Sequence, residues 1–155
     1  MKLPPKEVLV RRKFADGGEG EPLFPISAKG IVIENGKIWL RRNPRGEWEL
    51  PGGRVDDQEQ PQEAVTRELK EEIGYECEIE TLVDSYIWYK EFWGYPAVLV
   101  LSYRCRPTKK IGNPELLDEE GHKAKFQLIP IQEALELENL PNFYKAAIKE
   151  AIDER

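Results

Sequence analysis

The sequence predicts an α/β fold in which helices cover both sides of a mixed β-sheet. Strands are expected before, between and after the helices, and glycine, proline and asparagine separate the apolar segments. The chain has 155 residues, enough for one core; 40% of them are apolar and 34% are charged. This balance indicates a globular chain and excludes a disordered one.

The N-terminal segment, residues 1–25, is expected to be an irregular arm, because proline and glycine surround one short apolar patch that offers at most one strand. The compact domain is expected over residues 26–155. It begins with two antiparallel strands, residues 26–34 and 37–42, which the dipeptide Asn35-Gly36 joins. Asparagine and glycine supply the positive φ angles that a two-residue hairpin turn needs.

A helix over residues 61–73 is the most clearly marked element. Pro61 suits the first turn of a helix, and Gly74 marks its end. Before it we expect a loop at residues 43–46, a short strand at 48–50 and a turn at Pro51-Gly52-Gly53, where the backbone can approach other groups closely.

The second half of the chain predicts a pair of long strands, a final strand and two helices. The expected order is a strand at residues 75–89, a tip at 90–96, a strand at 97–105, a polar loop at 106–120, a strand at 122–129, a short helix from Pro130 and a terminal helix from Pro141.

The charge of the chain disfavours partners with a long phosphate backbone. Lys and Arg number 23 and Asp and Glu 29, which gives a net charge of −6, unsuited to binding extended nucleic acid. The N-terminus lacks the apolar run of a signal peptide, and no stretch approaches the ~18 apolar residues of a membrane span. We therefore expect a cytoplasmic protein without membrane contact.

The chain is poor in zinc ligands. Its two cysteines, Cys77 and Cys105, exclude a disulfide scaffold and a four-cysteine zinc site. Both lie in apolar strands, where buried free thiols are the simplest expectation. His122 is the single histidine of the sequence, and we interpret it as exposed or packed rather than catalytic.

Three carboxylates gather on one face of the predicted helix. At about 100° per residue, Glu68, Glu71 and Glu72 share an arc of roughly 100°, beside an apolar stripe. Like charges at this spacing cost about 0.2–0.5 kcal/mol per pair, which Arg67 and Lys70 relieve only in part. A solvated acidic face is the common explanation of such a pattern. A hard divalent cation is the other, since Mg²⁺ takes oxygen ligands from carboxylates, waters and phosphates.

The wider spacing favours the cation. Gly53 is followed after five residues by Glu59 and, after seven more, by the run Arg67-Glu68-Leu69-Lys70-Glu71-Glu72-Ile73-Gly74, with Leu50-Pro51-Gly52 directly before it. This pattern over residues 53–75 resembles the signature of the Nudix hydrolases. Chance agreement at its seven fixed positions is on the order of 10⁻⁸ per starting point. The departures are small and remove no carboxylate.

The resemblance implies both a fold and a chemistry. The fold would be the Nudix-type α/β/α sandwich with a mixed β-sheet. Members of the family hydrolyse a nucleoside diphosphate linked to another moiety, with Mg²⁺ or Mn²⁺ and a water that attacks phosphorus. Carried onto this chain, the metal ligands would be Glu68, Glu71, Glu72 and the Gly52 carbonyl, and Arg67 and Glu59 would orient the catalytic carboxylates Glu68 and Glu72.

Many members of the family use a further glutamate, from the loop before the last strand, as a metal ligand or general base. Six residues before Phe126 stands Glu120, which we expect in this role, with Glu119 as the alternative. A solvated acidic loop is the other interpretation of this run.

Substrate contacts are expected from arginines and from an aromatic tip. Arg41 and Arg42 end the second strand, and alternation sends one to each face, so that one would meet a substrate phosphate. Residues 86–95 hold six aromatic residues, among which Trp93, and next Trp88, are expected to stack on a base. The alternative use of these rings is sheet core or a homodimer interface.

The function that the resemblance implies is metal-dependent pyrophosphohydrolysis of a small nucleotide. A nucleotide sugar such as ADP-ribose comes first, since the acidic chain disfavours long RNA and the aromatic tip suits one base. The alternatives are a nucleoside triphosphate sanitiser and a hydrolase of dinucleoside polyphosphates or RNA 5′ ends. From another class comes a non-catalytic nucleotide-sensing regulatory module, against which the self-repelling cluster of Glu68, Glu71 and Glu72 argues.

Overall fold

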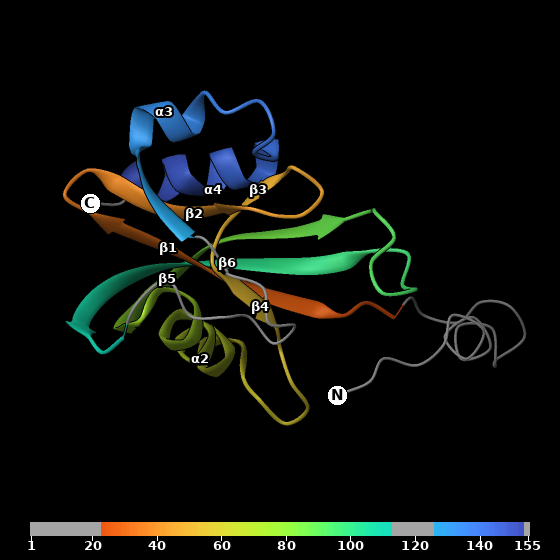
Figure 1. Cartoon of the computed structure of the whole chain (residues 1–155). Coiled ribbons are helices and arrows are strands. Elements are labelled where there is room, and N and C mark those ends of the chain that lie inside the picture. The colour runs from red at the N-terminus through yellow and green to blue at the C-terminus, as the bar shows by residue number, and fades with distance from the viewer. Residues whose placement is uncertain (1–22, 113–125, 154–155) are drawn as a thin grey trace, which may run out of the picture.

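The computed structural model describes residues 23–112 and 126–153, and within these ranges seven strands form a mixed sheet with helices on both sides (Figure 1). The predicted α/β fold class is therefore confirmed. The expected strand in the N-terminal arm, the residues Glu119, Glu120 and His122, and the start of the final strand lie outside the described residues.

The first two strands form the predicted hairpin. Strand β1 runs from Ile26–Glu34 and β2 from Lys37–Arg42, and the turn between them has φ angles of 49° at Asn35 and 76° at Gly36. Strand β1 then changes partners along its length. Its end pairs with β2, its first residues pair with β4, and most of it runs parallel to β6.

The expected turn at Pro51-Gly52-Gly53 is instead largely a strand. After β3 (Trp48–Glu49), β4 (Gly52–Arg54) pairs antiparallel with β1, with Gly52 opposite Lys29. The glycines predicted a turn because they tolerate unusual backbone angles. Here the lack of a side chain serves close packing, since a Cβ on Gly52, which has φ +138°, would lie 2.2 Å from the Ala28 carbonyl oxygen.

Helix α2 (Pro61–Ile73) has the predicted bounds. The backbone N–H of Gln60 donates a hydrogen bond of 3.1 Å to Glu63 Oε1 at its start, and Gly74 ends it with φ 73°. The predicted apolar stripe of Val65, Leu69 and Ile73 is buried against the sheet together with one side of β1 and β6, and Ala64 is buried beside it.

The long hairpin extends further than the sequence predicts. Strand β5 covers Tyr75–Trp88 and β6 covers Val98–Lys110, so residues 106–110 are strand rather than the start of a polar loop. Their polar composition predicted a loop, but they pair with the first residues of β5, and cross-strand pairing outweighs local preference.

The opposite side of the sheet carries the two remaining helices. Strand β7 (Phe126–Pro130) pairs with β2 and leads into α3 (Ile131–Leu135) and α4 (Asn142–Asp153). Figure 1 shows α2 below the sheet and α3 and α4 above it. The sheet therefore separates two apolar clusters, one between the sheet and α2 and the other between the sheet and α4.

Candidate active site

The glycine strand β4 and helix α2 meet at two carboxylates. The backbone N–H of Gly52 donates a hydrogen bond of 2.8 Å to Oε1 of Glu72. Gly53 lies against Glu68, because a Cβ at this position would lie 2.7 Å from Glu68 Oε1. A Cβ at Gly53 would displace the end of the Glu68 side chain, and the two glycines bring the backbone of β4 directly onto the acidic face of α2.

Arg67 is the centre of a charged network beside these carboxylates. Its Nε and Nη2 donate to both oxygens of Glu59, at 2.9 and 3.0 Å, and its Nη1 donates to Glu68 Oε1 at 2.9 Å. Nη2 also donates to the Arg54 carbonyl at 3.3 Å. The hydrogen bond from Arg67 is the main cause that lowers the pKa of Glu59. The network thus joins the loop before α2 to Glu68 by charge-assisted contacts.

The three predicted carboxylates differ in exposure. The side chain of Glu68 is 16% exposed and that of Glu71 is 52% exposed, with Glu71 lying 3.7 Å from Arg67. Glu72 is more enclosed, and burial together with the nearby charge of Glu68 raises its pKa well above the ordinary value. The repulsion that the helical wheel predicts is therefore concentrated at Glu68 and Glu72.

The oxygen donors at this junction suit a divalent cation. Within residues 23–112 and 126–153, no group of three acidic, histidine or cysteine side chains is arranged closely enough to hold an ion. Glu68 and Glu72 offer oxygens beside a glycine backbone that admits close approach. A cation between them would relieve the repulsion that raises the pKa of Glu72. The residues therefore fit the metal that the resemblance implies.

Lys29 is a charged residue of this region that sequence reasoning missed. It lies in β1 opposite Gly52, is 8% exposed, and directs Nζ to the Gly52 carbonyl at 3.4 Å. Burial lowers its pKa, but Tyr144, Glu49 and Glu72 outweigh this and raise it. The available signal was a single lysine in the otherwise apolar start of β1.

The two arginines at the end of β2 have different environments. Arg41 donates from Nε to Glu49 Oε1 at 2.6 Å and its guanidinium lies 5.5 Å from the Phe126 ring centroid. Burial opposes the charge of Glu49, but Lys29 and Arg41 hold its pKa below the ordinary value. Arg42 is exposed and donates to the Gly46 carbonyl at 3.3 Å. Of the two, Arg41 is on the side of Lys29 and Glu49.

The two tryptophans expected to bind a base are also separated by the structure. Trp88 is half-buried and packs against Phe92, Phe143 and Tyr144, with ring centroids 4.9, 5.0 and 6.5 Å away. It therefore belongs to the aromatic packing between the β5–β6 tip and α4. Trp93 is 50% exposed and lies beside Arg54 of β4.

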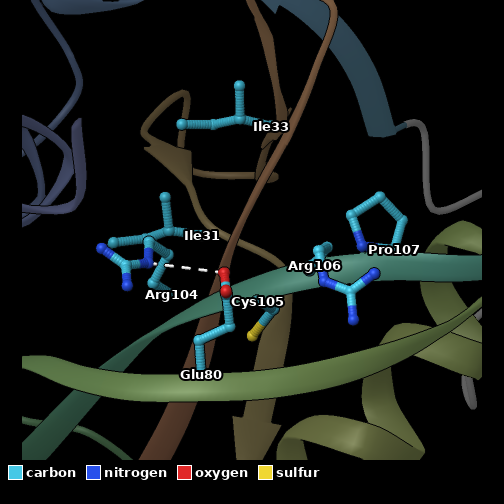
Figure 2. Close-up of a pocket in the computed structure, with 7 residues that line it drawn as sticks. All are labelled: Ile31, Ile33, Glu80, Arg104, Cys105, Arg106 and Pro107. Carbon is cyan, nitrogen blue, oxygen red and sulfur yellow. Dashed lines mark ion pairs between the residues drawn. The ribbon is translucent and has the colours of Figure 1, made fainter. Parts of the chain in front are cut away.

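A cavity of about 290 Å³ lies elsewhere, along β1, β5 and β6 (Figure 2). Its polar lining includes Glu80 and Arg104, which form an ion pair of 3.4 Å, and Arg106. None of its lining residues is among the predicted site residues. Cys105 also lines it and is a buried free thiol, whereas Cys77 is half-buried, so full burial was predicted correctly for Cys105 alone.

The family of the chain follows from comparison with known sequences. The sequence model of the NUDIX domain matches residues 25–151. The chain therefore belongs to the Nudix family, in agreement with the box that begins at Gly53. Among the helices that the structure describes, none is long and apolar enough to span a membrane.

Three relatives differ in name, and two of the names state a substrate. A MutT-like protein of Streptomyces ambofaciens is 35% identical over 89 residues, which are 56% of this chain and 54% of that protein. An 8-oxo-dGTP diphosphatase of Proteus vulgaris is 46% identical over 65 residues, which are 39% of this chain and 58% of the relative. An RNA pyrophosphohydrolase of Tolumonas auensis is 45% identical over 65 residues, which are 39% of this chain and 37% of that protein. The chain thus spans 37–58% of the length of these relatives.

Solved structures support the fold. A NUDIX hydrolase from Nitrosomonas europaea superposes with a TM-score of 0.69 at 19% identity, covering 85% of this chain and 90% of that one. An ADP-ribose pyrophosphatase from Streptococcus suis superposes with a TM-score of 0.59 at 18% identity, covering 85% and 92%. At this identity the likeness concerns the arrangement of strands and helices.

Proposed function

We propose that this chain is a divalent-metal-dependent pyrophosphohydrolase that acts on a small nucleotide whose diphosphate is linked to a further group. The observation that carries the proposal is the junction of β4 and α2, where Glu68 and Glu72 meet Gly53 and Gly52. Oxygen donors beside a backbone without side chains suit an ion and a phosphate that must approach closely.

The residues proposed to hold Mg²⁺ or Mn²⁺ are Glu68, Glu71, Glu72 and the Gly52 carbonyl. When bound, such an ion draws charge from phosphate oxygens and acidifies a water. Gly52 supports the arrangement from the protein side, because its N–H fixes one oxygen of Glu72. The second oxygen of Glu72 is not engaged by that hydrogen bond.

Arg67 and Glu59 have a positioning role in this proposal. Glu59 holds the guanidinium of Arg67 through two hydrogen bonds, and Arg67 in turn holds Glu68 Oε1. A carboxylate fixed in this way loses little rotamer freedom when it binds an ion. The general base or further ligand expected at Glu120 lies outside the described residues and stays a prediction.

Lys29 contributes a fixed positive charge under the same junction. Its ammonium lies 3.4 Å from the Gly52 carbonyl and is near Glu49 and Glu72. It offsets part of the negative charge that the site collects before any ion binds. We assign it to positioning of the Gly52 backbone.

ADP-ribose is the first candidate substrate. The net charge of −6 disfavours long RNA, and the half-exposed Trp93 lies beside Arg54 of β4, at the edge of the site. A nucleoside triphosphate is the second candidate, favoured by the name of the 8-oxo-dGTP diphosphatase relative.

The test is a substrate panel with product identification. The purified chain is incubated with ADP-ribose, 8-oxo-dGTP, dGTP, a dinucleoside polyphosphate and a short 5′-triphosphorylated RNA, each with Mg²⁺, Mn²⁺ or Ca²⁺. Hydrolysis of ADP-ribose would release AMP and ribose 5-phosphate, whereas a triphosphate would release a monophosphate and pyrophosphate. The Glu72→Gln variant, purified in parallel, shows whether the activity depends on the proposed metal site.

Two outcomes would count against the proposal. Equal product formation by the wild type and Glu72→Gln would show that the activity does not depend on the proposed metal site. Tight nucleotide binding in calorimetry without turnover, for every substrate and metal, would instead favour the non-catalytic sensing module.

A further inference from the structure

Arg54 and Trp93 form a contact at the edge of the junction between β4 and α2. The guanidinium carbon of Arg54 lies 4.9 Å from the centroid of the Trp93 ring. Arg54 directly follows Gly53, and its carbonyl accepts a hydrogen bond from Arg67. The contact therefore joins the tip of the β5–β6 hairpin to the strand that carries the site glycines.

The backbone holds Trp93 in a costly conformation. Phe92 and Tyr95 exchange two backbone hydrogen bonds, of 3.0 and 2.8 Å, which close a tight turn with Trp93 and Gly94 at its centre. Trp93 has φ 51°, a left-handed angle that bulky residues rarely adopt. The flanking residues Phe92 and Tyr95 are buried, at 8% and 9% exposure, so the turn is anchored while the indole stays exposed.

The guanidinium of Arg54 has a hydrogen-bond donor without a partner among the described residues. Within residues 23–112 and 126–153, its buried Nε has no hydrogen-bond partner. Burial lowers the pKa of Arg54, against the opposing influence of Tyr95 and Asp56. An arginine remains charged at neutral pH in such surroundings. A buried, unpaired donor on a charged group is costly, and an anion bound at the guanidinium would offset part of that cost.

We infer that Arg54 binds a phosphate group of the substrate and that Trp93 is the platform that orients its guanidinium. A guanidinium stacked on an indole keeps its N–H groups directed outward in its own plane, where two of them can bind a phosphate together. The inference rests on the proposed function and names a further contact for the same substrate. It gives Trp93 a role through Arg54 in place of direct stacking on a base.

A second arginine, in the loop between β2 and β3, lies over a ring of the same hairpin tip and supplies a matched control. The guanidinium carbon of Arg45 lies 5.6 Å from the Phe92 ring centroid, but its Nε donates to Glu47 Oε1 at 2.8 Å. Arg45 is thus stacked on an aromatic ring with its Nε paired within the protein. Substitution of Arg45 tests the loss of an arginine from this region without loss of the proposed phosphate contact.

The first experiment compares Arg54→Gln, Arg54→Lys and Arg45→Gln. For the substrate that the panel identifies, Arg54→Gln should raise KM by about 10- to 100-fold, as expected for loss of a charge-assisted hydrogen bond. The KM of Arg54→Lys should lie between the values of Arg54→Gln and the wild type, because lysine keeps the positive charge but lacks the planar guanidinium. Arg45→Gln should stay within about 2-fold. An unchanged KM for Arg54→Gln would overturn the inference.

The second experiment is a double-mutant cycle with Trp93→Ala. If Trp93 acts through Arg54, Trp93→Ala raises KM by about 2- to 30-fold, and the double variant is no worse than Arg54→Gln alone. Trp93→Phe should recover most of the affinity. If the increase in KM of the double variant equals the product of the increases in the two single variants, Trp93 contacts the substrate independently of Arg54. That result would overturn the platform role.

A binding measurement separates this inference from the proposed function. Calorimetry with inorganic pyrophosphate and Mg²⁺ gives Kd values for the wild type and for Arg54→Gln without turnover of a nucleotide. A Kd raised at least about 10-fold in Arg54→Gln supports the phosphate contact even if the substrate panel yields no product. Equal Kd values overturn it even if the panel identifies a substrate.

Discussion

The backbone N–H of Gly52 donates a hydrogen bond of 2.8 Å to Glu72 Oε1, across 20 positions of sequence. This contact ties the glycine strand to the acidic face of α2. It places the most enclosed carboxylate of the site where a second oxygen is available for an ion. The same enclosure makes Glu72 a source of instability when no cation is bound.

Glu72→Gln should separate stability from activity. A carboxyl whose pKa is raised in the folded state adds stability below its ordinary pKa of 4.5, and this contribution is lost as the pH rises through the raised pKa. Glutamine resembles the protonated form at every pH. With chelator present, the variant should therefore unfold at a higher temperature than the wild type at about pH 8, and the difference should shrink towards about pH 5. Thermal unfolding at both pH values checks this.

The same variant should lose turnover. Glutamine keeps the size and helix propensity but removes a charged oxygen ligand, so kcat should fall at least about 100-fold in saturating Mg²⁺. Near-wild-type kcat would contradict the assignment of Glu72 to the metal.

Gly53→Ala should disturb Glu68 without unfolding the protein. The added Cβ would lie 2.7 Å from Glu68 Oε1, the mobile end of a side chain that can shift. The shift of Glu68 that relieves this close contact should reduce kcat by about 10- to 100-fold. Gly36→Ala is the control, because its position has φ +76° and nothing within 4 Å. It should cost about 1–2 kcal/mol of stability with kcat unchanged. Equal kcat in Gly53→Ala and the wild type would remove the steric role of Gly53.

Arg67→Lys tests positioning of the carboxylates that are proposed to be catalytic. Lysine keeps the positive charge but cannot donate two parallel hydrogen bonds to Glu59 and a third to Glu68. We expect kcat to fall about 10- to 100-fold with little change in KM, since Arg67 is not assigned a substrate contact. Lys70→Gln, an exposed position of the same helix, is the control. A rise in KM at constant kcat would instead indicate a direct substrate contact.

Lys29→Met should destabilise the fold. Removal of the buried ammonium takes its positive charge away from Glu49 and Glu72 and its hydrogen bond away from the Gly52 carbonyl, which should cost about 1–3 kcal/mol. The double variant Lys29→Met/Glu72→Gln should recover part of this loss, because it also removes the carboxyl whose pKa burial and Glu68 already raise well above the ordinary value. Urea denaturation of the three proteins measures the effect. A single variant as stable as the wild type would show that Lys29 is not needed for charge balance.

The pair Glu120→Gln and Glu119→Gln tests the glutamate that the family resemblance implies before the last strand. Loss of a general base or metal ligand should lower kcat about 100-fold or more in Glu120→Gln and leave Glu119→Gln within about 2-fold. The reverse pattern would assign the role to Glu119. Wild-type kcat in both variants would support the interpretation of this run as a solvated acidic loop.

Local signals in the sequence determined the hairpin at Asn35-Gly36, the bounds of α2 and its division into apolar and acidic faces. Each depends on the angles one residue tolerates or on the 3.6-residue period of a helix, so a short window contains the information. The spacing from Gly53 to Gly74 likewise indicated the family before any contact was known.

Tertiary structure alone decided which of these residues meet. The strand at Gly52–Arg54, the extension of β6 and the burial of Lys29 all depend on partners far away in sequence. The same holds for Trp88 and Trp93, which are the same residue type in the same aromatic segment. Trp88 packs against Phe143 of α4, whereas a turn in which Trp93 has a positive φ angle places its ring against Arg54. Periodicity assigns a residue to a face, but burial, charge balance and strain are set by the elements that cover that face.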